Sequence, residues 1–361
     1  MAGVAIAAAL TAACSLLTSF EGFDQKQVSV GKVADAGDAP DAPAPDLCLR
    51  RRWPPPPVTG SDGDVGEFVS ALRSLKTINE SGIPYGFDLD NLCSCPERVA
   101  CVGARPNEPC DPKGSGIDNA ASDFFFLFSK VTGTAVDETG VRAGLDRGKF
   151  SLAFLLGRWN GEPNDPEVNL RLLNVFDANR NGDAGSARFD GNDTWVIDSE
   201  SLVGGVPTSP VIKAYVSGGV LVGEIPNLTF KSRIPTDGDK WLLLRIVLRD
   251  AHVTARIART PGGFSLTEGQ LGGRIPTADV ITLGMNLGIC PGTVTFDAVK
   301  PAICDTRDLP LDRAKDGRDF ACEAVSFGSR FEASPAKLAP TTETPLDMFP
   351  CKDAAPPSDC K

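Results

Sequence analysis

The sequence is poor in histidine, a residue that many catalytic and metal sites need. Its 361 residues include a single histidine, His252. This disfavours a mechanism that pairs a histidine base with a second histidine, and it disfavours a histidine-rich metal centre. Residues 251–257 alternate between apolar and polar types, which is typical of a strand. We therefore interpret His252 as a satisfied residue of a sheet.

Positive charge is also scarce. Lys and Arg number 36 against 47 Asp and Glu, which gives a net charge of −11 and a pI of about 4.8. The only basic run is Arg50-Arg51-Arg52, in a segment that is otherwise rich in proline. An acidic surface repels phosphate backbones, so we expect no nucleic-acid partner.

Common catalytic motifs are missing as well. The chain has no Gly-x-Ser-x-Gly elbow, no His-Glu-x-x-His and no phosphate-binding loop. A glycoside hydrolase needs two carboxylates about 5–10 Å apart. Glu162, Asp165 and Glu167 offer carboxylates, but two of them lie in a proline-containing turn. Trp159 nearby could stack on a sugar or belong to the core. Overall, an enzyme is less favoured than a non-enzyme.

The chain is, in contrast, rich in cysteine, with eleven in total. Cys14 stands apart near the N-terminus. The other ten form an even set, which in an exported protein predicts disulfides. The pair at 93 and 95 is Cys-x-Cys without a second Cys-x-x-Cys or a histidine pair, so zinc is disfavoured. The disulfide candidates are Cys48, Cys93, Cys95, Cys101, Cys110, Cys290, Cys304, Cys322, Cys351 and Cys360.

The N-terminus predicts export. Residues 2–13 are small and apolar and are too short to span a bilayer, as in a signal peptide. Leu10-Thr-Ala-Ala-Cys14 resembles a bacterial lipobox, in which Cys14 would carry lipid and become the mature N-terminus. The alternative is an ordinary cleaved signal that leaves Cys14 as a thiol. Residues 14–60 are rich in Ala, Asp and Pro and are expected to form a disordered tether.

The central part of the chain predicts strands. Short apolar runs are separated by Gly, Asn, Asp and Pro, which favours a mainly β fold, a sandwich of jelly-roll or concanavalin-like type with short helices and disulfide-rich flanks. The runs are residues 150–156, 169–176, 194–197, 212–216, 241–248 and 293–296. The expected segments are a signal peptide at 1–13, the tether at 14–60, a Cys/Asp-rich segment at 61–133, the sandwich at 134–304 and a Cys-containing segment at 305–361.

Several shorter stretches carry weaker expectations. Residues 67–78 fit a helix or a strand, whereas 120–130 and 137–146 predict helices, the first capped by Asp118 or Asn119. Residues 266–276 are turn-rich and lead into a short helix, and the pairs Gly204-Gly205 and Gly272-Gly273 are interpreted as turns. Residues 320–331 predict a helix or strand pinned through Cys322, and Cys351 and Cys360 are expected to close a terminal loop.

Oxygen ligands gather in the segment before the strand array, on loops that also contain cysteine and glycine. Ca²⁺ takes six to eight oxygen ligands from flexible loops, so a structural calcium clip is one interpretation. The other is turn and helix capping by Asp and Asn. The candidate ligands are Asp88, Asp90, Asn91, Asp111, Asp118 and Asn119.

A second loop, residues 176–183, matches the first half of an EF-hand. Position twelve would be Arg188, where a bidentate Glu is required, and the flanks read as strands. It is therefore a hairpin loop or a calcium loop of another kind, the latter completed by Asp183, Asp190 or Asp193. The candidate ligands within the matched half are Asp177, Asn179, Asn181 and Asp183.

Several signatures together resemble a group of uncharacterised, cysteine-rich lipoproteins of myxobacterial type. They are Cys14 in its lipobox-like setting, the Ala/Asp/Pro tether, Gly86-Phe-Asp-Leu-Asp90 with Cys93-Ser-Cys95, Gly116-Ile-Asp-Asn119 and Cys322-Glu-Ala-Val-Ser326. The resemblance implies a place in the cell envelope and carries no catalytic residues.

The sequence therefore predicts an envelope lipoprotein on the outer-membrane, periplasmic or surface face, held to the membrane through its N-terminal lipid. We expect a binding or interaction module whose ligand, a glycan or a protein, the sequence does not identify. The alternatives are a structural envelope protein without a small ligand and a secreted enzyme of the glycoside hydrolase type.

Overall fold

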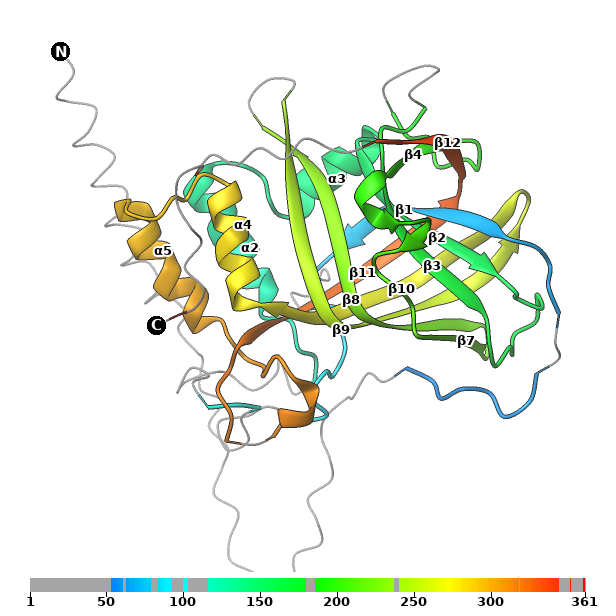
Figure 1. Cartoon of the computed structure of the whole chain (residues 1–361), viewed down its shortest axis with the longest axis horizontal. Helices are drawn as coiled ribbons and strands as arrows, with labels where there is room; N and C mark the ends of the chain where they lie inside the picture. Colours follow the sequence, from blue (N-terminus) through cyan, green and yellow to red (C-terminus); the bar gives the residue numbers. More distant parts are fainter. Residues whose placement is uncertain are drawn as a thin grey trace, which may run out of the picture. The chain divides into compact units, whose positions relative to one another are not determined.

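One sheet of ten strands lies at the centre of the computed structural model (Figure 1). The structure describes residues 53–60, 63–78, 84–92, 100–102, 116–179, 186–236, 240–317, 319–343, 351 and 360. The chain divides into Met1–Asp46 and Leu47–Lys361, and all described residues belong to the second unit. The signal peptide, Cys14 and most of the predicted tether therefore lie outside the described residues.

The sheet order is β12-β4-β3-β2-β1-β11-β10-β9-β8-β7, and a separate hairpin pairs β5 with β6. Neighbouring strands are antiparallel, except that β12 runs parallel to β4. The strands are β1 (Phe68–Lys76), β2 (Phe150–Gly157), β3 (Asn169–Phe176), β4 (Thr194–Asp198), β5 (Leu202–Val203), β6 (Val206–Pro207), β7 (Lys213–Ser217), β8 (Val220–Pro235), β9 (Trp241–Thr260), β10 (Gly263–Pro276), β11 (Ala324–Pro335) and β12 (Lys337–Glu343).

The sheet curves strongly, so that strands far apart in its order face each other across the core. Phe150 of β2 meets Phe230 of β8, five places along the sheet, edge to face with ring centroids 6.2 Å apart. Phe154 of β2 also stacks on Phe331 of β11, two places along the sheet, at 5.1 Å. Every residue of β2 is buried, because its outer face is covered as well, by a second cluster around Trp195. The mainly β class is confirmed, and the sandwich-like packing comes from one sheet that folds over on itself.

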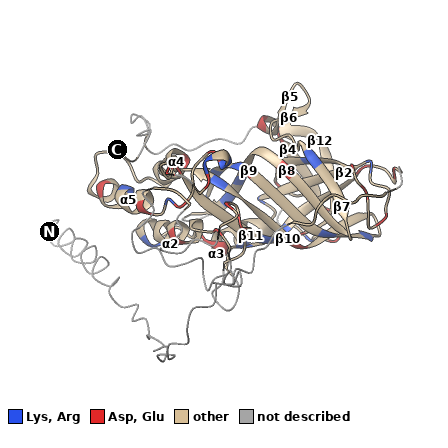
Figure 2. Ribbon diagram, turned by 90° about the horizontal axis from the view of Figure 1, so that it is seen from below, with Lys and Arg blue, Asp and Glu red and all other residues tan. Residues whose placement is uncertain are grey.

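Helices cover the core beside the sheet. In two perpendicular views α2, α4 and α5 lie beyond one end of the strands (Figure 1 and Figure 2). They bury Phe124, Phe125 and Phe128 from α2, and Val280 and Ile281 from α4. The helices are α2 (Ala121–Thr132), α3 (Glu138–Asp146), α4 (Thr277–Asn286) and α5 (Val294–Asp305), with 3-10 turns η3 (Ser199–Ser201) and η4 (Arg313–Lys315). No helix in the described part of the chain has the length and apolar character needed to span a membrane.

Disulfides tie the flanking segments to this core, as the sequence predicts. The described residues contain three: Cys101–Cys322, Cys290–Cys351 and Cys304–Cys360. The expectation that Cys351 and Cys360 close a terminal loop with each other is wrong. Cys351 bonds to Cys290, just before α5, and Cys360 bonds to Cys304, near the end of α5. The other candidates, Cys48, Cys93, Cys95 and Cys110, lie outside the described residues.

Several elements differ from the sequence expectation. Residues 293–296 are not the last strand but the start of α5, because Thr293 caps the helix by accepting the N–H of Phe296 at 3.2 Å. Residues 266–276, which were expected to be rich in turns, are instead part of β10. Gly272 and Gly273 lie inside that strand, where a Cβ on Gly272 would come within 2.8 Å of the Phe87 ring. Gly204 and Gly205, with positive φ, do form a turn.

The sheet also takes strands from the flanks. Residues 67–78 resolve as a strand, β1, and 320–331 contribute to β11, which lies beside it. The helices expected at 120–130 and 137–146 are present as α2 and α3. Ala120, rather than Asp118 or Asn119, occupies the α2 cap position, and its side chain makes no cap bond. Asp137 caps α3 by accepting the N–H of Thr139 at 3.0 Å.

Candidate functional site

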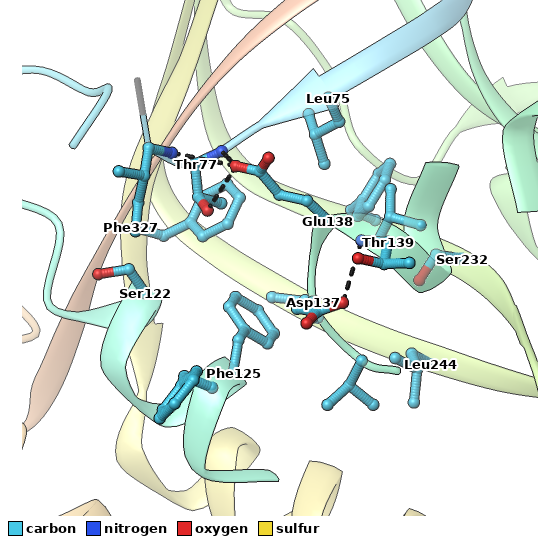
Figure 3. A pocket seen from close by; sticks show the side chains of 16 residues that line it. Leu75, Thr77, Ser122, Phe125, Asp137, Glu138, Thr139, Ser232, Leu244 and Phe327 are labelled. Carbon is cyan, nitrogen blue, oxygen red and sulfur yellow. Dashed lines mark hydrogen bonds between the residues drawn. The ribbon is translucent and has the colours of Figure 1, made fainter. Parts of the chain in front are cut away.

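A cavity of about 400 Å³ lies between the inner face of the curved sheet and the helices α2 and α3 (Figure 3). This volume is within the range of small-molecule pockets, about 300–1,000 Å³. Its floor is apolar, and its rim carries hydroxyl and carboxyl groups. The lining residues are Leu75, Thr77, Ile78, Ser122, Phe125, Phe126, Val136, Asp137, Glu138, Thr139, Val141, Phe230, Ser232, Leu244, Ile246 and Phe327. We call this the helix-side pocket.

Strand alternation builds the floor of the helix-side pocket. Side chains at every second position of a strand point to the same face of a sheet. Phe230 and Ser232 of β8 therefore face inward together, as do Leu244 and Ile246 of β9, and all four are buried. Phe327 of β11 joins them from the other side of the fold.

An irregularity in β1 supplies another wall. The register between β1 and β11 shifts between Leu72 and Ser74. An extra residue in one strand changes which face the following side chains point to. Leu72 belongs to the inner core, and after the shift it is Leu75, not Ser74, that lines the pocket.

The mouth is set by a contact between β1 and α3. Oε1 of Glu138 accepts the N–H and the hydroxyl of Thr77, the latter at 3.0 Å, and the N–H of Ile78 at 3.1 Å. Figure 3 shows the Glu138 and Thr77 side chains pointing toward each other above the aromatic floor. The end of β1 is thereby fixed to the first turn of α3, so the opening has a defined shape.

Two large apolar side chains of the lining are open to solvent. Phe126 is 59% exposed and Ile78 is 42% exposed, whereas Phe125 beside them is only 9% exposed. These apolar groups extend the apolar lining of the cavity to the protein surface. The arrangement suits a ligand with a large apolar part.

A second site brings together three of the predicted calcium ligands. Asp88, Asp90 and Asp118 are buried, and each offers a carboxylate oxygen within 4.8 Å of the others. Part of this arrangement is capping: Asp118 accepts the N–H of Leu89 at 2.6 Å, and Asp90 accepts the N–H of Leu92 at 2.7 Å. Asn91, in contrast, is exposed, and Asp111 lies outside the described residues. Calcium binding at this cluster stays a prediction from the sequence.

The protein supplies a cation close to this cluster. Arg274 is fully buried and donates to both oxygens of Asp316, at 2.7 and 2.6 Å, and to the carbonyl of Leu89 at 3.0 Å. Burial alone would lower the pKa of Arg274, but its hydrogen bonds to Asp316 and the charges of Asp316, Asp250 and Asp118 raise it. The guanidinium thus offsets part of the negative charge that the carboxylates bring into the core.

Asn119 has a structural role in this structure. Its side-chain amide donates to the carbonyls of Tyr85 and Gly328, both at 2.9 Å, and its oxygen accepts the N–H of Gly328 at 3.1 Å. It thereby joins the segment before α2 to β11. These contacts leave it engaged with backbone groups rather than with a metal ion.

In the second predicted calcium loop, the described candidate ligands contact groups of the protein itself. Asp177 is bound to Arg233 at 2.8 Å and to Lys149 at 3.4 Å. The Asn179 side chain donates to Asp193 at 2.8 Å, and Asp193 also accepts the N–H of Phe189 at 2.5 Å. Asn181 and Asp183 lie outside the described residues. These contacts favour the hairpin-loop interpretation.

The remaining sequence candidates lie apart from the helix-side pocket. Trp159 is buried in the core and donates its indole N–H to the carbonyl of Glu162 at 3.1 Å, so it offers no open face to a sugar. Asp165 accepts the N–H groups of Asn160 and Glu167, which is turn chemistry. His252 lies in β9 and is buried, as expected for a sheet residue, and its Nε2 atom lies 3.6 Å from Oδ1 of Asp250. Its Nδ1 atom has no hydrogen-bond partner among the described residues, so the expectation of a satisfied histidine is wrong for that atom.

Comparison with known proteins gives no family: no family model matches the chain, and no curated protein and no solved structure matches it.

The helix-side pocket was not predicted from the sequence. Its lining comes from six helices and strands spread between residues 75 and 327. The one available signal was the aromatic run Phe124-Phe-Phe126, which places Phe125 and Phe126 at the cavity.

Proposed function

We propose that this chain is an exported, lipid-anchored binding module and that its ligand is a small, largely apolar molecule held in the helix-side pocket. The observation that carries the proposal is the cavity of about 400 Å³, with an aromatic and aliphatic floor and exposed Phe126 and Ile78 at its mouth. Burying apolar surface contributes about 25 cal/mol per Å², so an aliphatic or aromatic ligand gains affinity from the floor alone.

Export is supported by the cysteine chemistry. Disulfides persist in oxidising compartments and are rare in the cytosol of mesophiles. The three disulfides of the described residues use six of the ten cysteines that follow Cys14. Together with the lipobox-like sequence before Cys14, this supports a place in the cell envelope. Mass spectrometry of the mature N-terminus tests the anchor, and an unmodified Cys14 would contradict it.

An apolar ligand is favoured over a glycan by the nature of the lining. Sugars present many hydroxyl groups, and a buried hydroxyl without a hydrogen-bond partner is costly. The floor of the pocket offers Ser232 among Phe230, Leu244, Ile246 and Phe327. A structural role without a small ligand and an enzyme of the glycoside hydrolase type are the competing functions.

A dye-binding experiment with a matched pair of variants tests the proposal. Nile red is apolar and fluoresces when it leaves water. We expect the protein to bind it in a saturable way and the Val141→Phe variant to lose that binding, because Val141 lines the pocket and a phenyl group there fills it. Val131→Phe is the control, since Val131 is exposed on α2 and is not part of the lining.

The possible outcomes separate the competing functions. Equal Nile red binding by both variants would show that the dye binds elsewhere and would contradict the proposal. Absence of binding to the unmodified protein would favour the structural role. A glycan array with hydrolysis controls tests the remaining possibilities. Glycan binding without hydrolysis would indicate a glycan ligand instead of an apolar one, and hydrolysis would indicate an enzyme.

A further inference from the structure

The chemistry of the pocket mouth narrows the class of ligand. Glu138 is fixed there because its Oε1 atom accepts hydrogen bonds from Thr77 and Ile78. Its second oxygen, Oε2, takes no hydrogen bond from any described residue. A carboxylate oxygen has lone pairs for two donors. Glu138 therefore presents a positioned acceptor at the edge of an apolar cavity.

The charge around this acceptor is negative. Asp137, also in the lining, adds a second carboxylate and already caps the first turn of α3. The positive end of the α3 dipole is thus offset by two carboxylates rather than left for an anion. No Lys or Arg occurs among the described lining residues. Lys130 lies outside the lining, with its Nζ atom 5.1 Å from the centre of the Phe126 ring.

We propose that the helix-side pocket selects amphiphiles with a protonated amine at one end and an aliphatic chain at the other. The amine would donate to Oε2 of Glu138, and the chain would lie over Phe125, Phe230 and Leu244 on the floor. This inference rests on the proposed function, since it names the ligand class for the same pocket.

The two parts of such a ligand match the two parts of the site. A hydrogen bond between an ammonium group and a carboxylate is stronger than one between neutral groups. A fatty acid would instead bring a third negative charge close to Glu138 and Asp137, and like charges at short range repel. A long-chain alcohol would keep the apolar contacts and one donor but lose the charge assistance. The expected order of affinity is amine, then alcohol, then carboxylate.

Three probes with the same chain length test this order: dodecylamine, dodecanol and dodecanoate, each at pH 7 and below its aggregation concentration. Their affinities are measured by displacement of Nile red from the unmodified protein. An alkylamine, like the lysine side chain with its pKa of about 10.4, is protonated at pH 7. We expect dodecylamine to bind about tenfold more tightly than dodecanol, and dodecanoate to bind most weakly.

The variant Glu138→Gln tests the role of Oε2. Gln keeps one oxygen for Thr77 and Ile78, so the contact between β1 and α3 is retained, but the negative charge is removed. The control is Glu332→Gln, which removes the same charge from β11 at a residue that pairs with Arg73 outside the lining. We expect Glu138→Gln to abolish the preference for the amine over the alcohol and Glu332→Gln to preserve it.

The outcomes distinguish this inference from the function on which it rests. The amine selectivity is overturned if dodecylamine binds no more tightly than dodecanol. It is also overturned if Glu138→Gln and Glu332→Gln lower the ratio of the two affinities equally. In both cases the binding function stands, provided that Nile red and dodecanol bind in the pocket. If Nile red does not bind the unmodified protein, the binding function is overturned, and the amine selectivity that rests on it is overturned too.

Discussion

The indole ring of Trp53 stacks on the imidazole ring of His252, with centroids 3.9 Å apart and planes inclined by 18°. Phe87 meets the same indole edge to face at 5.6 Å. Pro54, the next residue, accepts a hydrogen bond from the hydroxyl of Tyr215 at 2.6 Å. The folded unit thus includes Trp53 and Pro54, which the sequence places in the disordered tether. The stacking of Trp53 on His252 and the hydrogen bond from Tyr215 to the Pro54 carbonyl hold this part of the chain against the sheet.

Trp53→Ala is expected to lower the free energy of unfolding by about 1–3 kcal/mol, because it removes two aromatic contacts from a half-buried site. Pro55→Ala, at an exposed neighbouring position, should change it by less than about 0.5 kcal/mol. Guanidinium unfolding followed by fluorescence of the other tryptophans measures both. Equal, small effects would mean that the stacking contributes nothing to stability.

The hydrogen bond between Tyr215 and Pro54 predicts a pH dependence. Burial first, and the charge of Glu224 second, raise the pKa of Tyr215 from 10 to about 12. Folding therefore favours the protonated phenol. The stability that this group contributes is fully present below pH 10 and is lost as the pH rises through about 12.

Tyr215→Phe should therefore flatten the fall in unfolding free energy between pH 10 and 12. At pH 7 it should cost about 1 kcal/mol for the lost hydrogen bond. Urea unfolding at a series of pH values measures both effects, with Tyr85→Phe as the control that keeps Tyr215. The same alkaline slope in Tyr215→Phe as in the unmodified protein would contradict the prediction.

Asn119 is the best example of a residue whose role the sequence could not reveal. Its side-chain amide forms hydrogen bonds with backbone groups of Tyr85 and Gly328, and Gly328 lies 209 positions further along the chain. In contrast, the apolar runs of β2 and β3 and the alternation within β9 are visible in the sequence, because they are local patterns. The helix-side pocket is not visible, because it requires knowing that β1, β8 and β11 share one inner face.

The errors at β10 and α5 have local causes. Gly272 and Gly273 resemble a turn, but the strand needs glycine there because Phe87 and the carbonyl of Arg249 approach closely. The stretch from Thr293 to Phe296 contains β-branched and aromatic residues that favour strands. Its Thr293 cap and the buried Phe296, Val299 and Ile303 instead place it on a helix. Tertiary contacts and one capping bond outweighed propensity in these two segments.

Asn119→Ala is expected to lower the free energy of unfolding by about 2–5 kcal/mol, because it leaves several buried backbone groups without a partner. Asn192→Ala removes the same side chain at an exposed site and should cost less than about 0.5 kcal/mol. Thermal and urea unfolding compare the two. An effect of Asn119→Ala no larger than that of Asn192→Ala would contradict the assigned role.

The disulfide between Cys101 and Cys322 joins residues 221 positions apart. Replacing both cysteines with alanine should lower the free energy of unfolding by about 2–5 kcal/mol, because the unfolded chain is released from a long closed loop. The Cys304–Cys360 pair closes a loop of 56 positions and serves as the comparison, for which we expect a smaller loss. Urea unfolding under oxidising conditions measures both, and no loss for the Cys101–Cys322 variant would argue that the bond is not formed in the native protein.

Lys231 is buried in β8, and its Nζ atom lies 2.8 Å from Oδ2 of Asp198, which is also fully buried, and 2.5 Å from Oε2 of Glu200. Lys231→Met should cost about 3–5 kcal/mol, because it leaves the Asp198 carboxylate in the core without its cation. The double variant Lys231→Met/Asp198→Asn removes both charges, so it should recover part of that loss. A double-mutant cycle followed by urea unfolding measures the coupling. If the double variant is less stable than Lys231→Met by the full cost of Asp198→Asn alone, the two charges do not interact and the buried pair makes no contribution to the fold.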